Sequence, residues 1–254
     1  HRDLHSFPTR RSSDLEGDKY YYLQSFDNIE DGTLYVLAGL KNTDEKASQL
    51  KNLNMLQINN ELDVIKNLEI KFDYPQALVQ STIVLDDDDN ITELLCLFAP
   101  VKEGKNPDPQ KNNYTFIRIN SKLDLLDRIV LNSPANYWEV NDIVLTKDDN
   151  TFYLYGPSLS GKDQYYDQLT GTTKFNAFQV AKIANHKVEY LTETSIEEFD
   201  KKLESPPGQR KSPAYDGKKF DLSQLMVSTN GNLFITGQTW GGKLNAITGE
   251  REFT

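Results

Sequence analysis

Apolar and polar residues alternate along most of the chain in short runs, which is typical of antiparallel β-strands with one buried face. These runs come in pairs around turns rich in Asp, Asn and Gly, residues that accept the backbone of a tight hairpin. The pattern predicts an all-β fold containing four hairpins. Their strands are expected at 20–26 and 33–40, 78–85 and 91–98, 140–145 and 151–155, and 220–227 and 233–236.

A second segment recurs along the chain and completes each unit. Residues 57–65 (Gln-Ile-Asn-Asn-Glu-Leu-Asp-Val-Ile) align with 118–126 (Arg-Ile-Asn-Ser-Lys-Leu-Asp-Leu-Leu), and 182–190 is a looser third copy. Beyond the first copy, apolar and charged residues alternate through 68–72, the period of a strand with one buried face. Each unit is therefore predicted to contain four short antiparallel strands.

A four-stranded sheet of this size cannot bury its apolar face alone, so we expect successive units to pack face to face. Radial packing of such sheets gives a β-propeller, and we assign its blades to residues 20–72, 78–131, 137–192 and, incompletely, 220–254. Closure takes roughly four to eight blades. We therefore expect a partial β-propeller, a fragment broken at both ends.

Residues 194–219 are predicted to be an insertion before the last blade. The segment 194–198 (Thr-Ser-Ile-Glu-Glu) has the spacing of a helix capping box, and Pro206-Pro207 would end the helix. Ile196, Phe199 and Leu203 would share one face. The sequence thus predicts one short helical insertion in an otherwise β-rich chain.

Composition narrows the possible functions of the 254-residue chain. Its net charge of -10 disfavours nucleic acid and anionic lipid as partners, and no run of uncharged apolar residues is long enough for a spanning helix. The single cysteine, Cys96, excludes a disulfide framework and a cysteine-rich zinc site, and it is expected in the core.

Residues 1–15 (His-Arg-Asp-Leu-His-Ser-Phe-Pro-Thr-Arg-Arg-Ser-Ser-Asp-Leu) resemble the in-frame translation of a sequencing adapter, and we set them aside as non-native. The domain at 16–254 then holds one histidine, His186, which is expected in an exposed turn. A multi-histidine metal site cannot be built from it, and a catalytic triad would have only this base. We predict no catalytic residue, metal ligand or cofactor.

The segment 230–239 resembles a bacterial β-propeller repeat through Gly231, Asn232, Phe234, Gly237 and Thr239. The wider sequence is similar to uncharacterised propeller-like proteins of bacterial envelopes. This resemblance implies a scaffold located in the periplasm, at the outer membrane or outside the cell, and it implies no particular activity.

The candidate ligand-binding residues are Arg210, Lys211, Tyr215 and Trp240. The first three lie in 208–219, a positive island that suits an anionic partner, a glycan or a neighbouring domain; the alternative is a solvated connection. Trp240, like Trp138, offers a surface on which a sugar ring could stack, or it packs between blades.

Two further motifs suggest other chemistry. Residues 156–162 have the glycine and lysine spacing of a phosphate-binding loop, but Asp163 follows where Ser or Thr is needed, so nucleotide binding is not predicted. The acidic run 86–90 is expected to be a hairpin turn, with a structural calcium ion as the alternative.

The leading hypothesis is a non-enzymatic binding or scaffold module of the bacterial envelope with a protein or glycan partner. The rival hypothesis is a propeller hydrolase, acting on glycans or lactones, whose carboxylates converge at a central funnel.

Overall fold

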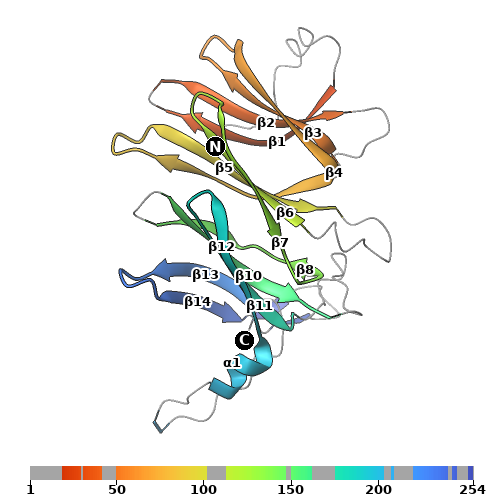
Figure 1. Ribbon diagram of the computed structural model, residues 1–254, viewed down its shortest axis with the longest axis vertical. Helices are drawn as coiled ribbons and strands as arrows, with labels where there is room; N and C mark the ends of the chain where they lie inside the picture. Colours follow the sequence, from red (N-terminus) through yellow and green to blue (C-terminus); the bar gives the residue numbers. More distant parts are fainter. Residues whose placement is uncertain are drawn as a thin grey trace. The chain divides into compact units, whose positions relative to one another are not determined.

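The computed structural model describes residues 19–29, 31–41, 50–101, 113–146, 150–161, 175–202, 207–208, 220–239, 242–244 and 251–253. This part of the protein is antiparallel β-sheet with one short helix, which confirms the predicted all-β class (Figure 1). Within these ranges, no helix has the length and apolar character needed to cross a bilayer. The chain divides into two units, 1–128 and 129–254, and each is described by itself.

The first unit is built on a seven-stranded sheet whose strands follow one another in sequence order. The division between the units falls inside the last of these strands. The strands are β1 (Lys19–Asn28), β2 (Thr33–Lys41), β3 (Leu50–Ile58), β4 (Val64–Leu85), β5 (Ile91–Pro100), β6 (Asn113–Asn120) and β7 (Leu125–Asn132).

Strand β4 takes part in two successive meanders. Its residues 64–71 pair with β3, its residues 76–85 pair with β5, and Gln76 pairs with both strands. Pro75, which has no amide hydrogen to donate, lies where the pairing passes from one neighbour to the other. The sequence predicted two separate strands here, and the structure joins them into one. We call the sheet before this point the first meander and the sheet after it the second meander.

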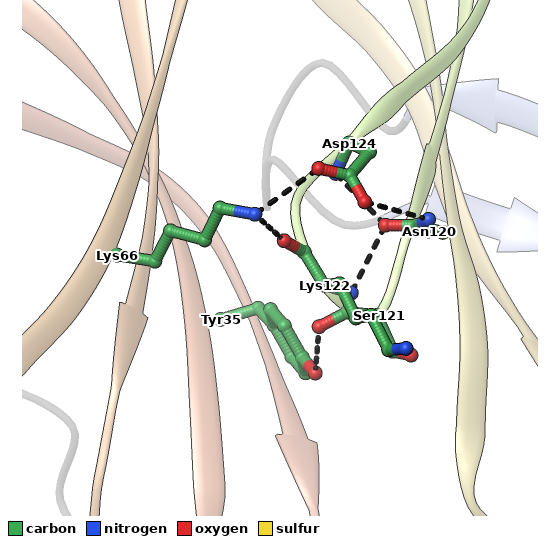
Figure 2. A network of polar contacts seen from close by, with 6 residues as sticks. All are labelled: Tyr35, Lys66, Asn120, Ser121, Lys122 and Asp124. Carbon is green, nitrogen blue, oxygen red and sulfur yellow. Dashed lines mark hydrogen bonds and ion pairs between the residues drawn. The ribbon is translucent and has the colours of Figure 1, made fainter.

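The sheet is folded over at β4. Strands β2 and β6 are four positions apart in the sheet order, which in a flat sheet would separate them by roughly 19 Å. Yet the Tyr35 hydroxyl on β2 donates a hydrogen bond of 2.8 Å to the carbonyl of Ser121, at the end of β6 (Figure 2). Lys66 on β4 also donates to the Lys122 carbonyl and to the Asp124 carboxylate, at 3.1 Å from Oδ1. The second meander therefore lies against the first.

One hydrophobic core joins the two meanders, as expected for sheets that shelter each other's apolar faces. The ring of Phe72 on β4 lies 5.1 Å from that of Phe98 on β5, and the Arg128 guanidinium covers Phe72 at 4.9 Å. The first meander contributes Phe26, Tyr35, Leu37, Leu53, Met55, Ile70 and Phe72; the second contributes Ile91, Leu94, Cys96, Phe98, Ile117, Ile119 and Leu123.

A single type of hairpin turn recurs in the chain, at 59–63, 86–90, 120–124 and 228–232. In each, the side chain of the first residue accepts the amide of the fifth, and the amide of the fourth bonds to the first carbonyl. The fourth residue is left-handed: Leu62, Asp89, Leu123 and Gly231 have φ of 69°, 61°, 55° and 82°. This is the three-residue hairpin loop with a bulge. The 61-residue alignment of 57–65 with 118–126 thus corresponds to equivalent hairpins.

The third copy of the aligned segment has a tighter turn. Asn185 and His186 both have positive φ, 51° and 62°, and Ala184 pairs with Lys187. This two-residue loop needs a left-handed backbone at both central positions. The repeat therefore keeps its strands and changes its turn.

The second unit contains a five-stranded sheet with the order β12-β11-β10-β8, in which β9 also pairs with β10. Tyr153 and Tyr155 of this sheet share a small core with Leu225 of the following hairpin. A last short hairpin, β15–β16, was not predicted from the sequence. The elements are β8 (Tyr137–Trp138), β9 (Asp142–Leu145), β10 (Thr151–Leu159), β11 (Ala177–Ala184), β12 (Lys187–Ser195), α1 (Ile196–Lys202), β13 (Phe220–Val227), β14 (Leu233–Thr239), β15 (Gly242–Leu244) and β16 (Arg251–Phe253).

The predicted helix start is confirmed. The Ser195 hydroxyl accepts a hydrogen bond of 3.3 Å from the amide of Glu198, so Ser195 caps α1. Because β12 runs up to Ser195, the helix follows the strand directly.

Candidate functional site

Tight turns and longer connections leave opposite ends of the sheets. In the first unit, the turns around 29–32, 59–63, 86–90 and 120–124 lie at one end, which we call the turn end. The connections β2–β3 and β5–β6 leave from the other end, the long-connection end. In the sheet of the second unit, the β10–β11 connection leaves opposite the turn at 185–186. Alternate connections of a meander share an end, and long ones are where binding groups usually lie.

A polar cluster lies at the long-connection end of the β8–β12 sheet, centred on the carboxylate of Glu193. Three donors converge on one of its oxygens, Oε2. The Gln179 amide donates to it at 2.7 Å, the Ser158 hydroxyl lies 3.3 Å away, and the Ser160 hydroxyl donates as well. Ser158 and Gln179 are fully buried, whereas Glu193 is exposed. The buried residues therefore fix the position of a carboxylate that solvent can reach.

A second set of hydrogen bonds orients the donors. The hydroxyl of Ser133 accepts the amide of Ala135 at 3.2 Å and donates to the Gln179 side-chain oxygen at 3.0 Å. Asn176 and the backbone of Ser160 exchange two bonds, of 2.8 and 2.7 Å. The Ser133 bond orients the Gln179 amide toward Glu193, and successive bonds of this chain polarise one another. The Asn176 bonds fix the backbone of Ser160.

The chemistry of this cluster is that of an oriented acceptor. An ionised carboxylate only accepts hydrogen bonds, and in the described residues the donors to Glu193 all bind Oε2. The neighbouring serine, asparagine and glutamine side chains are neutral and both donate and accept. Such a set suits a ligand with several hydroxyl or amide groups.

The second meander contains a second cluster of charged residues, and these residues form ion pairs with one another. The guanidinium of Arg118 binds Glu93 through two nitrogens, at 2.8 and 2.9 Å, and Asp127 at 2.7 Å. Burial disfavours the charge on Arg118, but hydrogen bonds with Glu93 and then Asp127 outweigh it and raise its pKa. The two carboxylates belong to one meander and share one arginine, an arrangement that holds β5, β6 and β7 together.

The candidate residues Arg210, Lys211, Tyr215 and Trp240 lie outside the described residues. Other expectations are met. Trp138 and Cys96 are buried, and burial raises the pKa of the Cys96 thiol to about 12. His186 is exposed in its turn. Residues 86–90 form the predicted hairpin turn, and the amide of Asn90 lowers the pKa of the Asp86 carboxyl that it contacts.

The phosphate-loop spacing at 156–162 does not mark a nucleotide site, since residues 156–159 are extended in β10 and residues 156–158 pair with β11. Gly156 allows a close approach of the segment between β8 and β9, because a Cβ there would lie 1.8 Å from the carbonyl oxygen of Glu139. The serines of this segment instead hold Glu193. Sequence reasoning missed Glu193 because its partners lie 14 to 35 residues earlier in the chain, and only strand register brings them together.

Comparison of the chain with protein families, with curated proteins and with solved structures gave no match. Within the described ranges, no three His, Cys, Asp or Glu side chains are arranged to hold a metal ion.

Proposed function

We propose that the protein is a non-enzymatic binding or scaffold module of the bacterial envelope, built from propeller blades. One observation supports the blade assignment: two successive meanders shelter their apolar faces in one shared core. The proposed location in the bacterial envelope rests on the resemblance of 230–239 to a bacterial propeller repeat.

The ligand we propose is a glycan, bound at the Glu193 cluster. The observation that carries this proposal is the fixed, exposed carboxylate held by Ser158, Ser160 and Gln179. Neighbouring hydroxyl groups of a sugar can donate to such a carboxylate. Because its orientation is already set, little conformational entropy is lost on binding.

The geometry favours binding over hydrolysis. Glycoside hydrolysis uses two carboxyl groups that flank the scissile bond. Around Glu193 the partners are hydroxyl and amide groups, while Glu93 and Asp127 are engaged with Arg118.

The test uses the full chain and a panel of bacterial and plant polysaccharides, with binding measured by retardation in polysaccharide-containing native gels and by calorimetry. Glu193→Gln replaces the acceptor carboxylate with a neutral amide and is expected to weaken binding at least about tenfold. The matched control is Glu189→Gln, on the same strand, where the carboxylate pairs with Lys182 at 2.8 Å. The control is expected to bind like the wild type.

Three outcomes would overturn the proposal. Release of reducing ends, or opening of an added lactone, would establish the hydrolase instead. Failure of every polysaccharide to bind would remove the glycan ligand. Equal binding by Glu193→Gln and wild type, with equal melting temperatures, would place the site elsewhere.

A further inference from the structure

Exposed apolar side chains gather at the turn end of the first unit. They flank the tight turns, and their exposed fractions range from 41% for Leu126 to 89% for Ile29. Large apolar residues with this much exposure are ordinary when scattered, but a concentration of them marks an interaction site. The set is Ile29, Leu62, Val64, Ile65, Leu85, Leu125 and Leu126.

The turns that carry these residues touch one another. A Cβ on Gly32 would lie 3.4 Å from the side chain of Asn60, so the first two turns are neighbours. Lys66 reaches Asp124 of the turn at 120–124, and the amide of Ser121 donates to the carbonyl of Thr92 at 2.9 Å. The turn end is therefore one continuous surface.

The apolar residues recur at equivalent positions of the two meanders. Val64 and Ile65 follow the turn at 59–63, and Leu125 and Leu126 follow the turn at 120–124. All four are exposed, by 41% to 55%, so burial within the described fold does not account for them. Leu123, in the same segment, is buried and belongs to the core.

The rim of this surface is acidic. The lysines here are Lys66, which is paired with Asp124, and Lys122. The exposed acidic residues outnumber them, and they are Asp31, Glu61, Asp63, Asp86, Asp87, Asp88, Asp89 and Asp124. Apolar anchors within an acidic rim complement a segment that has apolar residues on one face and Lys or Arg around them.

We propose that the turn end of the first unit binds a basic amphipathic segment of a partner protein. An anionic membrane surface or a nucleic acid would be repelled by the same rim, which excludes both as occupants. The site is separate from the Glu193 cluster and does not depend on the proposed glycan.

The test measures binding of the full chain to a fluorescein-labelled helical peptide of leucine and lysine, by anisotropy. The matched peptide has glutamate in place of every lysine. Leu125→Ser/Leu126→Ser is expected to weaken binding of the lysine peptide about tenfold. Asp87→Asn/Asp88→Asn, in an exposed turn, is expected to weaken it about threefold and to lessen its dependence on salt. The control is Val79→Ser, on β4 away from the turn end and 38% exposed.

The result expected is loss of affinity in both turn-end variants, with the control and the melting temperatures unchanged. The proposal is overturned if the lysine peptide does not bind, if the glutamate peptide binds equally well, or if Val79→Ser weakens binding as much as the turn-end variants. The Asp87→Asn/Asp88→Asn variant removes no buried group, so it decides the matter if the leucine variant fails to fold.

Discussion

The turns at 59–63 and 120–124 have the same backbone and different surroundings. Leu62 and Leu123 both adopt a left-handed conformation, yet Leu62 is 56% exposed and Leu123 is 2% exposed. The second turn also receives Tyr35 and Lys66 from the first meander (Figure 2). The comparison separates two contributions to stability. The five turn residues set the backbone conformation of each hairpin, and the packing around the turn sets how much each side chain contributes to the free energy of unfolding.

The largest difference is expected between the two leucines. Leu123→Ala leaves a cavity in the shared core and should lower the free energy of unfolding by about 3 kcal/mol. Leu62→Ala removes exposed atoms and should change it by less than about 0.5 kcal/mol. Urea unfolding followed by circular dichroism measures both. Similar losses in the two variants would show that the turns are equally embedded.

The asparagines that begin the turns should differ less. Asn120 accepts the amides of Lys122 and Asp124, at 3.0 and 2.8 Å, and donates to the Asp124 carboxylate. Asn120→Ala should cost about 1 to 2 kcal/mol, and Asn59→Ala, where the Asp63 amide is bound at 2.8 Å, about 1 kcal/mol. Asn120→Ser keeps an acceptor oxygen without bringing a second carboxylate up to Asp124, as Ser228 does in the turn at 228–232, and serves as the control in the same unfolding experiment. A larger loss for the serine than for the alanine would refute the role given to that oxygen.

A glycine at the left-handed position should have opposite effects in the two turns. At Leu62 it relieves the steric cost of φ 69° and loses little contact, so Leu62→Gly should stabilise by about 0.5 kcal/mol. At Leu123 the relief is outweighed by the lost core packing, so Leu123→Gly should destabilise. A rise in melting temperature for one variant and a fall for the other is the result to look for.

The smallest effect concerns the lysine that docks on the second turn. Hydrogen bonding from Lys66, and then from Asn120, lowers the pKa of the Asp124 carboxyl. A pKa lowered in the folded state means that this contact stabilises the fold above the ordinary pKa and is lost as pH falls through the lowered one. Lys66→Met should raise the pKa of Asp124 in a carbon-detected NMR titration. Asp86, which owes its low pKa chiefly to the Asn90 amide, should not move.

The features that could be predicted from the sequence are those determined by residues close together in the chain. Alternation and turn composition predicted the strands, the turn at 86–90 and the cap of α1, because these depend on contacts a few residues apart. The aligned segments 57–65 and 118–126 also predicted equivalent hairpins.

The rest depends on residues far apart in sequence. Pro75 marks a break in the alternation, so nothing local shows that β4 continues through it. The partners of Glu193 are Ser158 in β10, Ser160 just after it and Gln179 in β11, and only the register of β10, β11 and β12 aligns them. In the sequence, Gly156 is part of the spacing of a phosphate-binding loop. In the structure, a glycine is required there because the Glu139 carbonyl oxygen leaves no room for a Cβ.

The uninterrupted path of β4 has a mechanical consequence. Because the first part of β4 is hydrogen-bonded to β3 and the second part to β5, a pull on either end of the strand loads ladder hydrogen bonds in shear. A single cut between Asp73 and Gln76 would break no ladder hydrogen bond. The two meanders would then be held together by their shared core, by the Leu50–Gln76 pair and by the contacts of Tyr35 and Lys66 with the turn at 120–124.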